Sequence, residues 1–235
     1  MSNVKEMKLE DLSYHILPSK RFAGSSFSKL HDNVFNFFVR RWEEAFNNTK
    51  DQGTPAHGWE DHFLKQDIVT AITCKDEVVA AHLYTVYDLS AASTRKSEYF
   101  SFFPQTTIPE LIRRGIQNVT SMEYLCVDES VKRNTLELSL GKTILGLGGY
   151  LTENKGLDAS IGTPLAGNKV DIMMENVGGV LLEKGIKKYG FPVDLLFIPT
   201  KPCHPGRDPK TREVMTTLWN RRLDYTKEFY SKFAA

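Results

Sequence analysis

The sequence predicts an α/β (α+β) protein in which helices flank a mixed, mostly antiparallel central sheet and a C-terminal amphipathic helix packs on the body. Three observations predict it: a strongly amphipathic helical stretch, a β-branched hairpin after it, and a later alternation of strand and helix patterns. With 235 residues, 41% of them hydrophobic, the chain can bury one substantial core. We expect one domain over residues 1–200, with a loop and helix over 201–235 packed on it.

A long amphipathic helix is the clearest element of the first half. Between residues 27 and 46, apolar side chains recur at spacings of three and four, and charged side chains lie mostly outside that stripe. Residues 1–25 are mixed in character, and residues 47–58 are rich in Asn, Gly, Thr and Pro, which is typical of a loop. The helix therefore needs a flat apolar surface to pack on.

A hairpin and a central strand supply that surface. Residues 67–74 and 78–87 are β-branched and aromatic, and the short polar link between them predicts antiparallel pairing. Prolines and a glycine break residues 89–118 into short helical pieces. These lead into residues 119–127 (VTSMEYLCV), which we predict to be the central strand.

The second half alternates between helix and strand patterns. The expected elements are a helix over 135–154, a strand over 157–165, a helix over 168–177, a hairpin of 180–183 with 193–199, and an amphipathic helix over 208–233. Gly146, Gly148 and Gly149 lie inside the first of these helices and favour close packing, at some cost in helix propensity.

Charge and cysteine usage exclude several classes of protein. Thirty basic residues against 29 acidic ones leave a net charge of +1, so no overall field attracts nucleic acid or an anionic membrane. No run of about 18 apolar residues predicts a membrane span, and the N-terminal stretch does not look like a signal peptide. Three widely spaced cysteines disfavour a disulfide framework and a structural zinc site. We expect a cytoplasmic protein.

Two familiar motifs fail on their spacing. Gly141-Lys142-Thr143 is similar to the end of a Walker A loop, but Leu136 stands where that loop needs a glycine. His57 and His62 do not have the HExxH spacing and have no evident third ligand. The sequence therefore predicts neither a nucleotide-binding loop nor a metal site.

The order of elements carries a resemblance to a known superfamily. The central strand holds Met122 to Glu129 (MEYLCVDE), the basic turn Ser130 to Thr135 (SVKRNT) follows it, and Asn168 opens a later helix. With the preceding helix and hairpin, this order resembles the GNAT acyltransferases. In that superfamily the central strand presents backbone groups to the pantetheine arm of acyl-CoA, and the next turn binds the pyrophosphate.

The resemblance implies a set of donor-binding residues. A helix N-terminus with unpaired amides and cationic side chains makes a local anion site, although such a turn can also be merely solvated. The implied donor-binding residues are Leu125, Cys126, Val127, Lys132, Arg133, Asn134, Thr135 and Asn168.

Departures from the superfamily pattern point to one branch of it. Thr135 and Glu137 stand at glycine positions of the phosphate turn, and Met174 falls where a tyrosine can act as general acid. The acyl-homoserine-lactone synthases and N-acyl amino acid synthases resemble GNAT folds with such a degenerate turn. They commonly take acyl chains from acyl carrier protein, whose single phosphate needs less cradling. The implied donor is thus acyl-CoA or acyl carrier protein, and the acceptor is a small-molecule amine.

The implied reaction needs a base beside the central strand. An amine that attacks a thioester must lose a proton, and Glu123 is the candidate base with Tyr124 next to it. Strand alternation predicts that these two side chains point to opposite faces, so that only one faces the cleft. Glu123 could instead be an ordinary solvent-facing residue. We interpret Cys126 as an apolar packing residue, since no histidine lies near it in sequence.

Two other functions fit the same sequence. A GNAT-like module could bind a ligand without chemistry, which the missing tyrosine and glycines favour. The C-terminal helix could also serve as a homodimer or partner surface, if it exposes an apolar stripe.

Overall fold

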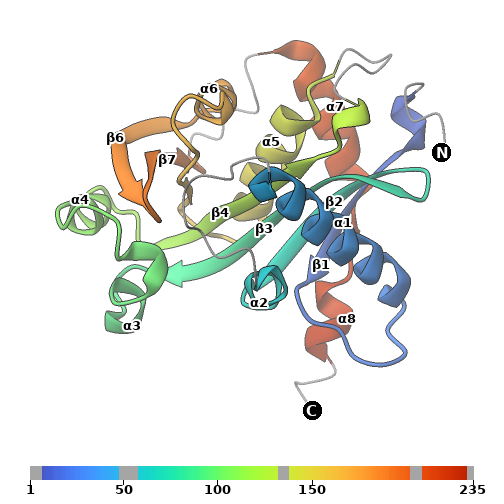
Figure 1. Ribbon diagram of the computed structural model, residues 1–235, viewed down its shortest axis with the longest axis horizontal. Coiled ribbons are helices and arrows are strands. Elements are labelled where there is room, and N and C mark those ends of the chain that lie inside the picture. The colour runs from blue at the N-terminus through green and yellow to red at the C-terminus, as the bar shows by residue number, and fades with distance from the viewer. Residues whose placement is uncertain (1–6, 48–57, 132–137, 202–207, 232–235) are drawn as a thin grey trace.

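The computed structural model describes residues 7–47, 58–131, 138–201 and 208–231, and it confirms the predicted fold class. A single eight-stranded sheet has the order β6-β7-β5-β4-β3-β2-β1-β8, with helices on both faces (Figure 1). The strands are β1 (Leu12–Pro18), β2 (Ile68–Cys74), β3 (Glu77–Asp88), β4 (Asn118–Val127), β5 (Ala159–Gly162), β6 (Val180–Lys188), β7 (Phe191–Pro199) and β8 (Leu223–Asp224). The α-helices are α1 (Ser28–Asn47), α2 (Trp59–Leu64), α3 (Ala92–Arg95), α4 (Thr107–Arg113), α5 (Leu140–Asn154), α6 (Val170–Asn176), α7 (Pro209–Asn220) and α8 (Thr226–Ser231), and the 3-10 helices are η1 (Leu9–Asp11), η2 (Glu98–Phe100) and η3 (Glu129–Val131).

Strand β1 was not predicted from the sequence. It pairs antiparallel with β2 along its whole length, and nearly all of its side chains are buried. A strand covered on both faces has no alternation of apolar and polar residues, which is the pattern that identifies half-buried strands. The polar residues Tyr14 and His15, both buried here, weaken the signal further.

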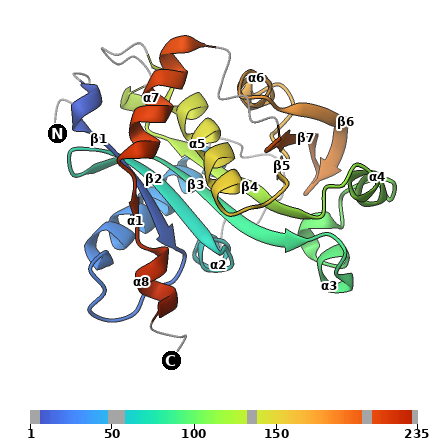
Figure 2. The ribbon, with the colours of Figure 1, turned by 180° about the vertical axis from the view of Figure 1, so that it is seen from behind.

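The helices form a layer on each face of the sheet. Figure 1 shows α1 and α2 in front of the sheet, and Figure 2 shows α5 and α7 on the opposite side. Helix α5 lies very close to the sheet, because a Cβ atom at Gly148 would be 2.5 Å from the Tyr84 hydroxyl. The glycines of α5 therefore allow close packing. The helix begins at Leu140, with the side chain of Ser139 accepting from the N–H of Lys142, and part of the predicted start lies outside the described residues.

The strands after α5 differ in length from the prediction. β5 is short, and a bridge from Leu165 continues toward Val193 of β7. β6 and β7 form a longer hairpin than predicted, closed by Tyr189 and Gly190, whose φ angles are 52° and 84°. Both residues of such a two-residue turn need positive φ, and the tyrosine at the first position hides the signal.

The C-terminal helix is present, but it is divided into α7 and α8 by the short strand β8. β8 pairs in parallel with β1, and Asp224 accepts from the N–H of Thr226, which begins a new helix. The apolar side of α7 packs on α5 through Val214, Met215 and Leu218, which are buried. The division at residue 200 stays a prediction. No helix within the described ranges is long and apolar enough to span a bilayer.

Candidate active site

Strands β4 and β5 separate halfway along β4. They pair in parallel only from Val119↔Ala159 to Met122↔Gly162. Beyond this point β4 continues to Val127 and pairs with β3, whereas the chain after β5 bridges to β7. One edge of β4 from Glu123 onward therefore has no strand beside it in the described part of the chain. An unpaired strand edge offers backbone N–H and C=O groups with which a ligand can pair.

A β-bulge lies at this separation. The β3–β4 register shifts between Ala81↔Cys126 and Leu83↔Glu123, and Tyr124 has a φ of 57°. This conformation costs a bulky residue about 1–3 kcal/mol, and such residues concentrate at functional sites.

The bulge overturns the expected alternation of side chains. Glu123 pairs with Leu83, which packs on the α1 face, and Tyr124 packs on that face as well. Leu125 instead packs on the α5 side. The prediction that Glu123 and Tyr124 face opposite ways was wrong, because the extra residue of a bulge interrupts the two-residue period.

The Glu123 carboxylate lies in a largely enclosed polar cluster. Ser121 donates to its Oε1 over 2.7 Å. Burial raises the pKa of Glu123, while the Lys188 ammonium and the Ser121 hydrogen bond oppose that rise and Glu98 adds to it. The tyrosine rings whose pKa values Glu123 raises further are Tyr87, Tyr99, Tyr124 and Tyr189. A carboxylate with a raised pKa is suited to act as a general base.

Lys188 brings a cation to the same cluster from the end of β6. Its Nζ donates to Thr163 Oγ1 over 3.0 Å and lies 4.7 Å from the centre of the Tyr99 ring. Burial lowers the pKa of Lys188, and the carboxylates of Glu123 and Glu98 oppose that shift. Lys188 was not predicted as a site residue because the expected strand ended at residue 183, although the glycine after Tyr189 is a turn signal.

Tyr124 joins the cluster to α1 and α2. Its hydroxyl is 2.9 Å from Nδ1 of His62, and its ring lies edge-on to those of Phe38 and Trp42. Burial raises the pKa of Tyr124 and lowers that of His62, so both groups are neutral near pH 7. His62 therefore serves as a partner of Tyr124.

The α5 side of the separation is apolar. A Cβ atom at Gly162 would be 2.9 Å from Cε of Met174, and one at Gly141 would be 3.0 Å from Sδ of Met173. Leu125 and Val127 pack on the same side. Methionine side chains are flexible and adapt to apolar ligands. Met174, which the sequence resemblance aligned with a tyrosine of the GNAT acyltransferases, is buried and cannot donate a proton.

The other predicted donor-binding residues divide into three groups. Cys126 is buried on the α1 face, its thiol donates to the Tyr124 carbonyl, and burial raises its pKa to about 12, so it is not a nucleophile. Asn168 Oδ1 accepts from the N–H of Val170 at the start of α6. The remaining predicted donor-binding residues, Lys132, Arg133, Asn134 and Thr135, lie outside the described residues.

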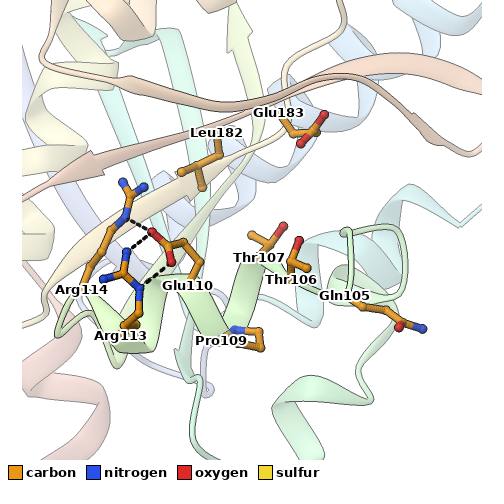
Figure 3. A pocket seen from close by; sticks show the side chains of 9 residues that line it. All are labelled: Gln105, Thr106, Thr107, Pro109, Glu110, Arg113, Arg114, Leu182 and Glu183. Carbon is orange, nitrogen blue, oxygen red and sulfur yellow. Dashed lines mark hydrogen bonds and ion pairs between the residues drawn. The ribbon is translucent and has the colours of Figure 1, made fainter.

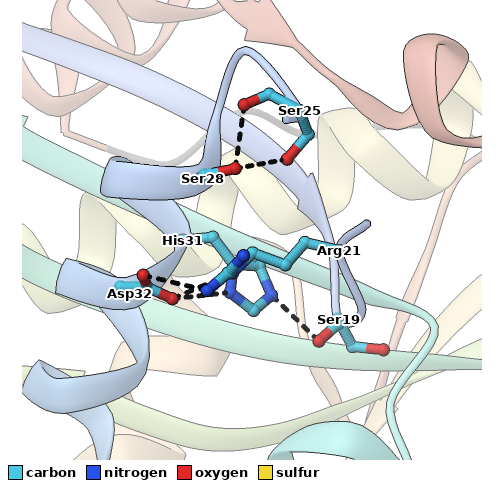
Figure 4. Close-up of polar contacts among 6 residues, drawn as sticks. All are labelled: Ser19, Arg21, Ser25, Ser28, His31 and Asp32. Carbon is cyan, nitrogen blue, oxygen red and sulfur yellow. Dashed lines mark hydrogen bonds and ion pairs between the residues drawn. The ribbon is translucent and has the colours of Figure 1, made fainter. Parts of the chain in front are cut away.

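Two further polar groups, away from β4, are bound by their own partners. An open hollow between α4 and β6 contains Glu110, but Arg113 and Arg114 already bind its carboxylate (Figure 3). On α1, the His31 ring bonds to the Ser19 carbonyl at 3.0 Å (Figure 4). Near it, Arg21 and Asp32 bind each other, and Ser25 and Ser28 do the same. The His31 group thus contains no serine activated by the histidine.

Comparison with known proteins shows similarity in fold without similarity in sequence. No protein-family model matches the sequence, and no curated protein matches it. An agmatine N-acetyltransferase mutant in the apo form superposes with a TM-score of 0.55 at 12% identity, over 80% of this chain and 99% of that one. The N-acyl amino acid synthase FeeM, from uncultured soil microbes, has a TM-score of 0.55 at 12% identity, over 81% of this chain and 90% of its own.

A third structure is similar over more of the chain. The CoA-dependent acyl-homoserine lactone synthase BjaI, determined with SAM and isopentyl-CoA, has a TM-score of 0.53 at 10% identity and covers 91% of this chain and 93% of its own. At these identities the likeness establishes the fold alone.

Proposed function

We propose that this chain, whose fold is that of the GNAT acyltransferases, moves an acyl group from a thioester donor to an amine acceptor. One observation carries the proposal. β4 and β5 separate immediately beyond Met122 and Gly162, and the enclosed carboxylate of Glu123 stands at that point. Two strands that separate, with an edge of β4 that lacks a strand partner and a carboxylate beside it, suit aminolysis of a thioester.

The proposed step can be written with its bonds balanced. The thioester arm lies in the slot between β4 and β5, and the amine approaches from the α1 face. The amine nitrogen bonds to the carbonyl carbon, its proton passes to Glu123, and the carbon–sulfur bond breaks. The sulfur leaves as thiolate, which needs no protein acid because alkyl thiols ionise with a pKa of about 8.5. The chemistry therefore tolerates Met174 in place of a tyrosine.

The proposal also concerns the acyl donor. The apolar side of the slot, with Met173 and Met174, is suited to an acyl chain. The carrier is acyl-CoA or acyl carrier protein, and the loss of glycines at Thr135 and Glu137 favours the latter. Cys74 and Cys126 are free and buried, in keeping with the reducing cytoplasmic setting that we propose.

A thiol-release assay tests the proposed activity. The protein is incubated with acyl-CoA or acyl carrier protein of several chain lengths, together with a pool of small amines and amino acids. The proposal predicts amine-dependent release of free thiol and an amide product detected by mass spectrometry. Donor binding without thiol release for any pair would instead support the non-catalytic module, which the buried Met174 favours.

The role of the C-terminal helix as a partner surface finds less support. In α7, Val214, Met215 and Leu218 are buried, whereas beyond it Leu223 and Tyr230 are exposed singly, so the described part of this region shows no continuous apolar stripe. The homodimer stays a proposal, and the mass in solution tests it.

A further inference from the structure

Lys188 reaches the point where β4 and β5 separate, on the β5 side. Met122↔Gly162 is the last pair between β4 and β5, so Glu123 and Thr163 are the first residues beyond it on the two strands. The Nζ atom of Lys188 is 3.0 Å from Oγ1 of Thr163. The ammonium is therefore held at the first β5-side residue beyond the last pair, and its charge acts on the Glu123 carboxylate, the first β4 residue beyond that pair.

The hairpin tip that carries Lys188 is held in place by its neighbour. The Tyr189 hydroxyl donates to Glu98 Oε1 over 2.8 Å, and its ring is 4.9 Å from that of Phe102. Tyr189 thus ties the β6–β7 turn to the segment around η2. This contact fixes the direction of the Lys188 side chain over the Tyr99 ring, where it is mostly shielded from water.

The contacts that hold the Lys188 ammonium do not neutralise its charge. Within the described residues no carboxylate lies within 4.0 Å of its Nζ, which is held by a hydroxyl and a ring face. From this half-buried position the ammonium favours the charged form of the Glu123 carboxylate, which burial would otherwise lead to take up a proton.

We propose that Lys188 is a positioning residue that keeps Glu123 ionised and ready to accept the proton of the incoming amine. The inference rests on the proposed function, in which Glu123 is the base. Lys188 itself touches no reacting atom. Its effect is that of a fixed counter-charge, supplied by a hairpin distant in sequence.

Other groups around Glu123 act on it in known directions. Glu98 is a like charge and opposes Lys188. Burial raises the pKa values of the surrounding tyrosines, which stay neutral at working pH. The groups that face the cluster are Tyr87 from β3, Glu98 and Tyr99 from η2, Tyr124 from β4, Tyr189 from the hairpin, and His62 from α2 through its bond to Tyr124.

Direct titration of Glu123 tests the inference without any substrate. Carbon-13 NMR of labelled glutamate side chains follows the carboxyl carbon, and Glu123→Gln identifies its signal. Lys188→Met is expected to raise the titration midpoint of Glu123 by about one pH unit. Lys188→Arg should keep this midpoint near the wild-type value. Glu98→Gln should move it in the opposite direction. A midpoint unchanged in Lys188→Met overturns the inference.

Thr163→Val provides a second variant in case Lys188→Met does not fold. It removes only the hydroxyl that holds the ammonium, and it should raise the midpoint by less than Lys188→Met does. An unchanged midpoint in this variant, with Lys188→Met unfolded, also overturns the inference.

Kinetics separate this role from acceptor binding. In Lys188→Met, the acid limb of kcat/KM should move to higher pH by the same shift, with the acceptor KM unchanged at high pH. A raised acceptor KM with an unmoved limb would make Lys188 a substrate ligand instead. If no donor and amine pair reacts, the proposed function fails, whereas the titration still decides whether Lys188 controls the charge of Glu123.

Discussion

The two halves of β4 differ in how fully they are held. From Val119 to Met122 the strand lies between β3 and β5 and is paired on both sides. Under α5, Thr120, Thr152 and Ser160 form a closed triangle of hydroxyl groups at 2.6–3.0 Å. From Glu123 to Val127 the strand is paired only with β3, contains a bulge, and carries an enclosed carboxylate.

This difference separates stability from function within one strand. The first half satisfies its buried polar groups and lowers the free energy of folding. The second half contains a strained tyrosine, an edge without a strand partner and a carboxylate with a raised pKa, all of which oppose folding. Substitutions in the first half should therefore affect mainly stability, and substitutions in the second half mainly activity.

The largest expected effect is that of Glu123→Gln on turnover. Removing the base should lower kcat/KM by roughly 10²- to 10⁴-fold, while the free energy of unfolding stays equal or rises, because the raised pKa of Glu123 shows that the fold disfavours its charged form. Thiol release and thermal melts measure the two quantities. Glu77→Gln, an exposed site at the start of β3, is the matched control and should be unaffected. Full activity of the Glu123 variant would remove the base from the mechanism.

The pH dependence of protein stability tests the environment of His82, which lies where the two halves of β4 meet. His82, on β3 opposite the bulge, is buried beside the Tyr84 hydroxyl, and burial lowers its pKa to about 3. In the folded protein His82 stays neutral, whereas in the unfolded chain it takes up a proton below about pH 6.5. The free energy of unfolding therefore falls as pH falls from about 6.5 toward 3. Between pH 6.5 and pH 4.5, the titration of His82 alone should reduce the free energy of unfolding by roughly 2.5 kcal/mol.

His82→Gln keeps a hydrogen-bonding group and removes the titration. Urea unfolding at pH 7, 6, 5 and 4.5 should therefore show a flatter pH dependence for the variant than for the wild type. Parallel curves for the two proteins would show that His82 titrates normally. His15, whose pKa burial lowers to about 4, leaves a residual slope in both proteins.

Thr120→Val tests the fully paired half. It leaves the hydroxyls of Thr152 and Ser160 without their shared partner and should reduce the free energy of unfolding by about 1–2 kcal/mol. Thr120→Ser, the control, keeps the hydroxyl. Turnover per folded molecule should be unchanged in both variants. A lower turnover per folded molecule would contradict the claim that the first half of β4 contributes to stability and the second half to activity.

Tyr124→Phe should have the smallest effect. The ring keeps its contacts with Phe38 and Trp42, and only the hydrogen bond to His62 is lost, which is worth about 0.5–1.5 kcal/mol. We expect a modest loss of stability and a change in turnover of less than about tenfold. A loss of activity as large as that of Glu123→Gln would instead make Tyr124 a direct participant.

Sequence patterns identified the elements with regular periodicity and missed those without it. The stripe of α1 and the β-branched runs of β2, β3 and β4 predicted these elements within a few residues. β1 was missed because burial on both faces removes alternation, and the C-terminal helix is broken by β8, which pairs with that same missed strand.

The candidate site was less predictable than the fold. Glu123 and Tyr124 were identified as site residues from the central strand, but their shared face depends on a bulge that no residue type signals. Lys188, Glu98 and His62 come from segments far apart in sequence, so only the tertiary structure brings them to Glu123. Their types are those of ordinary surface residues, and their partners are what distinguishes them.

The central claim is that a thioester arm lies between the second half of β4 and the end of β5. A crystal structure with a thioether analogue of acyl-CoA, which cannot transfer its acyl group, tests this most directly. We predict elongated density beside residues 123–127 and 162–165, with the carbonyl group nearest Glu123. Density in the hollow between α4 and β6, or an empty slot at a saturating analogue concentration, would contradict the claim.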